Sequence, residues 1–317
     1  MKKFEVCVAL FFCLAFLSAC AHRYENKRLE VFNENSGYRF YADDAIDKNT
    51  NSLFVCLTLS GGGTRAAAFS YGVLKALKRN VKWPAGGERE VRLLDEVDVI
   101  SSISGGSFTA GYYGLFGDGI FADFEEKFLN RNIQGELFWA VLNPINLIRL
   151  TSSRFDRIDL AAEIYNETIF QNQTFADIQR RSRRPFIVMN GTNMTTGAQF
   201  SFRQEQFDII GSDLEPYPVA NAVAASSAFP LLLSPVTLKN YPEPEGFKLP
   251  IWISLGVKDR DNPRRYQVAT SLEPYATHKD QHPYVHVVDG GLSDNLGLRL
   301  VIDEYRRGFI RQLLKGV

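Results

Sequence analysis

Apolar runs that end in short turns recur along this chain, and each of the first two is followed by a helical pattern. Residues 53–59 (LFVCLTL) are almost continuously apolar, as in a strand buried on both faces of a sheet. The glycine-rich turn 60–65 (SGGGTR) follows, and apolar side chains then recur at helical spacing over 66–79. Residues 97–103 and 105–116 repeat this order, as a strand and a helix rich in small residues. The alternation predicts an α/β domain with a mostly parallel central sheet flanked by helices.

Later segments extend the same pattern. Residues 186–190 and 284–288 are predicted strands, and 219–229 is a predicted helix that Pro230 stops. A last helix is expected to begin at a cap formed by Ser293 or Asp294.

Two regions follow the pattern less well. Residues 124–170 alternate apolar and charged positions at helical spacing, which predicts a helical insert. Its apolar side chains around Pro144 belong either to the core or to a lid or lipid-contacting surface. Residues 256–283 are polar with almost no aliphatic pattern, and we expect a long loop there.

The amino terminus has the layout of a secretory signal peptide. Lys2 and Lys3 precede an apolar run over residues 6–17, which is shorter than the about 20 residues that span a bilayer. The run ends in Leu-Ser-Ala-Cys, which resembles the bacterial lipobox, and this resemblance implies that Cys20 carries the lipid. Cleavage as an ordinary signal peptide is the alternative.

We therefore expect a signal peptide over residues 1–19, a polar spacer or tether over 20–50 and one folded domain over 51–317. Lipid chains on Cys20 would hold this domain at a membrane surface. The expected location is the bacterial cell envelope, with the anchor in the outer membrane and the domain on its periplasmic or surface side.

Charge and cysteine content narrow the possible partners. Lysine plus arginine and aspartate plus glutamate number 36 each, so the net charge gives no reason to expect nucleic acid as a partner. The arginine cluster at 180–184 is short and is expected to be a solvated loop. Cys7 and Cys13 fall in the signal peptide, and acylation of Cys20 would leave Cys56 without a disulfide partner, as a buried apolar residue.

The first turn offers a site for an anion. Gly61, Gly62 and Gly63 lie between a strand and a helix, where backbone N–H groups can point at a phosphate or an oxyanion. The turn is not a Walker loop, because no Gly-Lys-Ser/Thr follows, and a dinucleotide fingerprint would have glycine at Ala66. A nucleotide-binding enzyme and a merely structural turn remain alternatives.

The stretch 101–107 (SSISGGS) contains a candidate nucleophile. A nucleophile elbow places serine on a sharp strand-to-helix turn and needs small residues two positions before and after it. Ser104 meets this condition, with Ser102 on one side and Gly106 on the other. Ser102 stands where the Gly-x-Ser-x-Gly pattern has its first glycine.

A serine nucleophile needs a base, and the four histidines do not offer a well-placed one. His22 is in the expected spacer, His278 and His282 are in the expected loop, and His286 alternates within a strand. Asp289, in contrast, ends that strand and precedes two glycines. Because the carboxyl ends of parallel strands line one crevice, we expect Asp289 to lie near Ser104 and the glycine turn.

These three motifs, in this order, resemble those of the patatin-like phospholipases. The resemblance runs from residue 53 to residue 303 and includes the stretch 226–230 (SSAFP). It implies a three-layer α/β/α domain that hydrolyses phospholipid or other lipid esters with a Ser-Asp dyad and no cofactor or metal. Carried over by position, it makes Ser104 the nucleophile and Asp289 the base.

The resemblance also implies the oxyanion hole and one substrate contact. Its donors would be N–H groups of Gly61, Gly62, Gly63 and Gly105. Arg65 would fix the loop, meet a lipid phosphate or pair with a carboxylate. The alternative function is a catalytically inactive scaffold that binds lipid or a protein partner, because Ser102 and Ala66 replace motif glycines.

Overall fold

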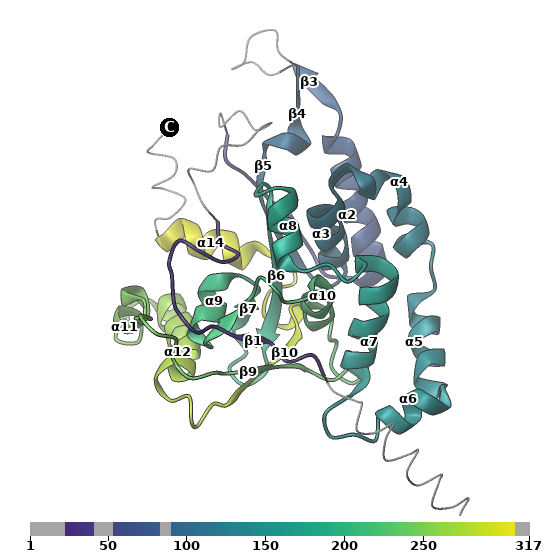
Figure 1. The fold of residues 1–317 in the computed structure, drawn as a ribbon. Coiled ribbons are helices and arrows are strands. Elements are labelled where there is room, and N and C mark those ends of the chain that lie inside the picture. Colours follow the sequence, from purple (N-terminus) through teal and green to yellow (C-terminus); the bar gives the residue numbers. More distant parts are fainter. Residues whose placement is uncertain (1–22, 41–52, 83–89, 308–317) are drawn as a thin grey trace, which may run out of the picture.

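A computed structural model of the chain describes residues 23–40, 53–82 and 90–307 and centres on a six-stranded mixed sheet (Figure 1). Five strands follow one another across it, and a sixth pairs with β6 alone. Across the sheet they are β2 (Val55–Leu59), β5 (Val97–Ile103), β6 (Phe186–Asn193), β10 (Tyr284–Asp289) and β9 (Val236–Lys239), with β7 (Gln199–Ser201) beside β6.

Strand direction divides the sheet into two parts. β2, β5 and β6 are parallel neighbours, whereas β10 is antiparallel to both β6 and β9. β9 therefore points the same way as β6, and β10 and β7 are the reversed strands. The sheet expected to be mostly parallel is thus a mixed one whose first three strands are parallel.

Helices cover both faces of the sheet, which confirms the predicted α/β class. Figure 1 shows α2, α3 and α7 on one side of the sheet and α9, α11, α12 and α14 on the other. The longer helices are α2 (Gly63–Leu77), α3 (Gly105–Phe116), α5 (Ile133–Leu142), α7 (Arg157–Tyr165), α10 (Val219–Ser226), α12 (Pro263–Thr277) and α14 (Leu298–Arg307).

The remaining elements are short. The helices among them are α4 (Ile120–Phe124), α6 (Pro144–Arg149), α8 (Phe175–Arg181), α9 (Gln204–Ile209), α11 (Ile251–Gly256) and α13 (Gly291–Asp294). Single 3₁₀ or π turns are η2 (Leu93–Glu96), η3 (Gly117–Gly119), η4 (Glu125–Leu129) and η5 (Asn166–Phe170). Two-stranded pairs are β1 (Lys27–Arg28) with β8 (Ser212–Asp213) and β3 (Asn80–Lys82) with β4 (Glu90–Arg92).

The small residues of α3 let this helix lie close to the sheet, as the sequence predicted. A Cβ atom at Gly114 would come within 2.8 Å of Ile187, and one at Gly111 within 3.0 Å of Met189. Larger side chains would push α3 off β6, and with it the turn that starts at Ser104. Close packing of this helix therefore helps to fix the position of the candidate nucleophile.

Residues 263–277 form a helix, so the expected loop over 256–283 is wrong for this stretch. Pro263 occupies its first turn, and the side chain of Asn262 caps it by accepting from the N–H of Arg265. Its buried positions are mostly small or aromatic, and aliphatic periodicity therefore did not reveal the helix. They are Ala269, Ser271, Leu272 and Tyr275.

Residues 23–40 pack against the domain, which corrects the expected spacer for this part of 20–50. Tyr38 is buried, and its hydroxyl donates to the carbonyl of Ile187 at 3.0 Å. Asn26 is also buried and donates to Ser212 and to the carbonyl of Lys239. The signal peptide predicted over 1–19 and Cys20, predicted to carry the lipid, lie outside the described residues.

The region 124–170 is helical, as expected, and part of it is core. α7 packs on α10 and buries Ile158 and Leu160. Five apolar side chains of α5 and α6 are instead exposed, so the core interpretation is wrong for these five: Phe138, Trp139, Leu142, Ile145 and Leu147. Within the described ranges, no helix is long and apolar enough to cross a membrane.

Candidate active site

Ser104 lies on a strained turn between β5 and α3. Its φ of 47° and ψ of −118° fall outside the regions that non-glycine residues normally occupy. β5 ends at Ile103, so Ser104 lies at the edge of the sheet, and α3 begins at Gly105. This is the strand-to-helix geometry that the elbow interpretation requires.

The hydroxyl of Ser104 donates a hydrogen bond to the carboxylate of Asp289. The distance from Oγ to Oδ2 is 2.9 Å, and both residues are largely buried, at 9% and 7% exposure. Oδ1 of the same carboxylate accepts from the N–H of Gly291 at 2.7 Å, which fixes its orientation. The two residues expected to form the dyad are therefore in direct contact.

Burial raises the pKa of Asp289 above the ordinary aspartate value of 3.8. Hydrogen bonds from the N–H of Gly291 and from Ser104 act in the opposite direction and offset part of this rise. A carboxylate with a raised pKa is a better proton acceptor than an exposed aspartate. The carboxylate is thus suited to take a proton from Ser104.

Asp289 reaches the site by a route that differs from the expected one. β10 is antiparallel to β6. Its direction alone would therefore not bring its carboxyl end to the edge of the sheet where the parallel strands have their carboxyl ends. The register places Asp289 opposite Gly191, one residue beyond the Asn190 that pairs with Ile103 of β5. The reversed strand therefore ends at the level of Ser104.

The glycine turn touches the nucleophile turn through the backbone. A Cβ atom on Gly105 would lie 2.0 Å from the carbonyl oxygen of Gly63, and Gly62 and Gly63 have φ values of 141° and 63°. Such a close approach and such backbone angles require glycine. The amino ends of α2 and α3 therefore meet beside Ser104, each with N–H groups that have no helical acceptor.

The three glycines do not have the same role. The N–H of Gly61 donates to the carbonyl of Asn295 at 2.9 Å, so it ties the turn to the segment before α14. This does not support Gly61 as an oxyanion donor. Gly62 and Gly63, at the start of α2, and Gly105, at the start of α3, are the backbone donors that remain at the site.

Ser226, which the sequence did not single out as a site residue, holds the nucleophile turn in place. Its Oγ accepts from the N–H of Ser104 at 2.9 Å and donates to the carbonyl of Asn190 at 2.7 Å. It is fully buried at the end of α10. The stretch 226–230 (SSAFP) was the signal that pointed to this region.

Ser102 replaces the first glycine of the elbow pattern without leaving a polar group unpaired. It is fully buried in β5, donates to the carbonyl of Val188 and accepts from the hydroxyl of Ser107 at 3.0 Å. The substitution is therefore compatible with the turn.

Arg65 lies in the first turn of α2 and is exposed to solvent. No ion pair joins its guanidinium to a carboxylate within the described residues. The histidines that the structure describes are elsewhere: His286, for example, contacts Thr237 on β9. The hydrogen-bonded partner of Ser104 is a carboxylate.

A comparison with protein families matches residues 57–302 to the patatin-like phospholipase model. The match covers most of the chain, and the chain belongs to this family. A search of the curated proteins gave no match. Family membership indicates an ester hydrolase that acts on lipid acyl groups.

Proposed function

We propose that this protein is a serine acyl hydrolase of the phospholipase or lysophospholipase type, with Ser104 as nucleophile and Asp289 as base. The observation that supports it most is the 2.9 Å hydrogen bond between a strained, buried serine and a buried carboxylate. The glycine turn beside this pair supplies the third part of the site.

The reaction follows from these positions. Ser104 Oγ attacks the ester carbonyl carbon while its proton passes to Asp289 Oδ2. The carbon–oxygen bond to the alcohol then breaks, and the alcohol leaves with that proton. Water, deprotonated by Asp289, attacks the acyl-enzyme, and the acid is released as Ser104 regains its proton.

Backbone N–H groups of Gly62, Gly63 and Gly105 stabilise the oxyanion of each tetrahedral intermediate. They lie at the starts of α2 and α3, where the helix dipole also favours negative charge. Donors of this kind are typically worth about 10²–10³-fold in rate each. Arg65, exposed one turn away, is positioned to meet the phosphate of a lipid headgroup.

A lipid surface is the proposed partner of the site, because apolar side chains surround it. The segment after Ser226 contains Phe229, Leu231 and Leu232, all exposed, and no charged residue occurs between Ser226 and Leu238. Leu231 is 90% exposed and has a φ of 79°, which is unfavourable for leucine. Exposed apolar groups held at such a cost are typical of interaction surfaces.

A second segment extends this surface on the other side of the dyad. Leu292 and Leu296 follow Asp289 closely and are exposed. The backbone N–H of Asp289 donates to the carbonyl of Ala228, so the two segments meet beside the carboxylate. We call Phe229, Leu231, Leu232, Leu292 and Leu296 the apolar rim.

We also propose that Cys20 is acylated and holds the domain at a membrane of the bacterial envelope. The support is the signal-peptide layout and the lipobox-like sequence before Cys20. The tether is short, because residues from Arg23 onward already contact the domain. An outer-membrane anchor remains the expected location.

The activity is tested with short-chain p-nitrophenyl esters and purified protein. Hydrolysis is expected to fall on the order of 10⁴-fold in Ser104→Ala and in Asp289→Asn, since each removes one half of the dyad. Hydrolysis that survives either change at the original rate contradicts the dyad. Folded wild-type protein that binds lipid vesicles but hydrolyses no ester would instead favour the inactive scaffold.

A further inference from the structure

α5 and α6 carry an exposed apolar surface at the outer edge of the molecule, beyond α7 (Figure 1). The other side of α5 packs on α7, and Leu137, Ala140 and Val141 are partly buried there. The exposed side chains, between 46% and 70% accessible, are called the α5–α6 surface: Phe138, Trp139, Leu142, Ile145 and Leu147. Large apolar groups that gather on two adjacent helices are typical of an interaction surface.

The charge pattern of this surface limits what covers it. Residues 137–148 contain no charged side chain. Glu136, just before them, pairs with Arg131, and Arg149, just after them, pairs with Glu163. The surface therefore suits a hydrocarbon environment better than a protein partner selected by charge complementarity. An exposed tryptophan among aliphatic side chains is also typical of helices that lie in a membrane interface.

The amino end of the described chain lies beside these helices. The backbone N–H of Arg23 donates to the carbonyl of Arg154 at 2.7 Å. Arg154 follows the last residue of α6 by five positions, which span at most roughly 18 Å. The residues between them fold into turns, in which the N–H groups of Thr151 and Ser152 donate to carbonyls of α6, so the actual separation is shorter.

Cys20 is therefore close to the α5–α6 surface. It precedes Arg23 by three residues, which span at most roughly 11 Å. A lipid on Cys20, as proposed above, brings the membrane to this side of the domain. Attachment at one point also keeps the surface at a high effective concentration next to the bilayer, so a small apolar area is enough for contact.

We propose that the α5–α6 surface inserts into the membrane that holds the lipid of Cys20. Apolar faces of such helices enter about 5–10 Å into the boundary between headgroups and acyl chains. The contact is a second attachment, and it fixes the orientation of the domain on the membrane. It rests on the proposed acylation of Cys20, but it uses none of the residues of the dyad or of the apolar rim.

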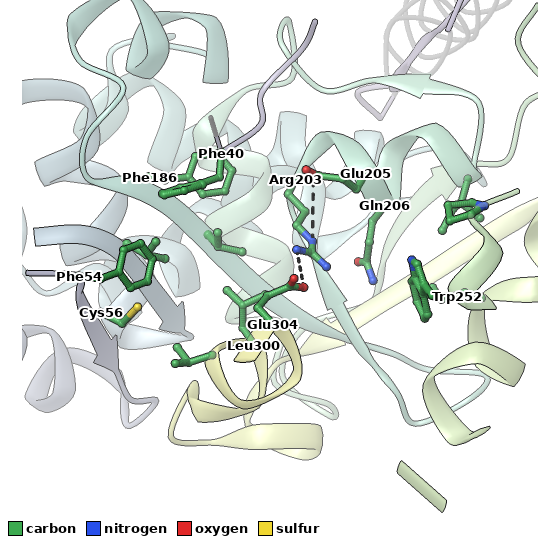
Figure 2. A pocket seen from close by; sticks show the side chains of 16 residues that line it. Phe40, Phe54, Cys56, Phe186, Arg203, Glu205, Gln206, Trp252, Leu300 and Glu304 are labelled. Carbon is green, nitrogen blue, oxygen red and sulfur yellow. Dashed lines mark ion pairs between the residues drawn. The ribbon is translucent and has the colours of Figure 1, made fainter. Parts of the chain in front are cut away.

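Fluorescence of Trp139 measures this contact. Trp83 and Trp252 are replaced by phenylalanine; Trp252 lines a cavity between the sheet and α14, well inside the other half of the domain (Figure 2). Ser104→Ala is added so that the lipid is not hydrolysed. The full chain is produced in bacteria and reconstituted into vesicles of phosphatidylcholine and phosphatidylglycerol with or without brominated acyl chains, which quench tryptophan in the bilayer. We expect at least half of the Trp139 emission to be quenched, and absence of quenching overturns the proposal.

A second position of the tryptophan shows whether the quenching is confined to this surface. Trp139→Phe with Ile302→Trp moves the probe to an exposed position of α14, which covers the other face of the sheet. Quenching there is expected to be less than a third of that at Trp139. Equal quenching at the two positions contradicts a contact through α5 and α6.

A matched pair of variants tests the surface without disturbing its helices. Asn143 caps α6 by accepting from the N–H of Ile145, and aspartate caps a helix equally well. Asn143→Asp therefore adds only a negative charge, which is costly inside a bilayer, and quenching of Trp139 is expected to fall at least threefold. Asn262→Asp makes the same change at the cap of α12 and should leave the quenching unchanged. Equal effects of the two variants contradict the proposal.

The mass of the amino-terminal peptide separates this proposal from the acylation of Cys20. An acylated chain whose Trp139 is not quenched overturns the contact and leaves the anchor standing; dimers formed by crosslinking on the vesicles would then assign the surface to a second copy. A chain without lipid on Cys20 refutes the anchor. Quenching of Trp139 that Asn143→Asp lowers would still support the contact in that chain, whereas no quenching would overturn both.

Discussion

The hydroxyl of Ser104 donates to Oδ2 of Asp289 at 2.9 Å, although 185 residues separate the two in the sequence. The contact depends on two independent pieces of backbone: a strained turn at the end of β5 and a reversed strand, β10, that ends at the same level of the sheet. No histidine takes part in this contact. The chemistry proposed for the protein therefore depends on the proton affinity of one buried carboxylate.

The loss of esterase activity at low pH is expected to follow the protonation of Asp289. Because burial raises the pKa of Asp289, the carboxylate takes up its proton at a higher pH than an ordinary aspartate, and activity is lost as the pH falls through that raised pKa. We expect kcat/KM for a soluble ester to decline at a pH above 3.8, with the protein still folded. A decline at or below 3.8 contradicts a buried base.

Removing the hydroxyl of Ser226 should impair catalysis through the position of Ser104. Ser226→Ala leaves the buried N–H of Ser104 without its acceptor, and small displacements of a nucleophile cost about 10²-fold in rate. We expect kcat to fall by about that factor with KM little changed. Ser227→Ala is the matched control, because that hydroxyl bonds within its own helix. Equal losses in both variants contradict a positioning role.

The contact between the glycine turn and the nucleophile turn predicts that alanine at Gly105 lowers activity, whereas alanine at Gly72, away from the contact, does not. Gly105→Ala places a methyl group 2.0 Å from the carbonyl oxygen of Gly63, so the glycine turn must move and esterase activity is expected to fall more than 10²-fold. Gly72→Ala meets no atom within 4 Å, in the middle of α2, and should stabilise the protein by about 0.5–1 kcal/mol with activity unchanged. Thermal unfolding and ester hydrolysis measure both; an active Gly105→Ala protein contradicts the close approach.

The apolar rim is expected to matter for aggregated lipid but not for soluble ester. Leu231→Gly together with Leu232→Ser removes two exposed apolar side chains and relieves the backbone strain at residue 231. Hydrolysis of phospholipid vesicles should drop at least tenfold, while hydrolysis of a soluble p-nitrophenyl ester stays within about twofold. Ile251→Ser, an exposed apolar position at the start of α11, is the control. Parallel losses on both substrates contradict a docking role for the rim.

Local rules of the sequence predicted the parts of the site that lie close together in the chain. The small flanks of Ser104 and the glycines before α2 are requirements of one strand-to-helix turn each, and the structure has both turns. The position of Asp289 was also predicted, but for a parallel strand, and β10 is antiparallel. The direction in which a strand joins the sheet depends on the path of the whole chain, and the hydrophobic pattern of one segment does not determine it.

Contacts between distant segments account for what the sequence did not predict. Ser226 contributes through a bond to a residue 122 positions away, and Tyr38 packs against β6 although its own segment is polar. α12 was expected to be loop because only one of its buried side chains, Leu272, is a large aliphatic one, and the others are small or aromatic. In each case the residues are buried by a segment that is distant in the sequence, so the pattern of their own segment does not indicate the burial.

The most direct test of the account is covalent labelling with a fluorophosphonate, followed by mass spectrometry of the labelled peptide. The account predicts one labelled residue, Ser104, with labelling that is lost in Ser104→Ala and strongly slowed in folded Asp289→Asn. A folded wild-type protein that is not labelled, or that is labelled on another serine, would contradict it.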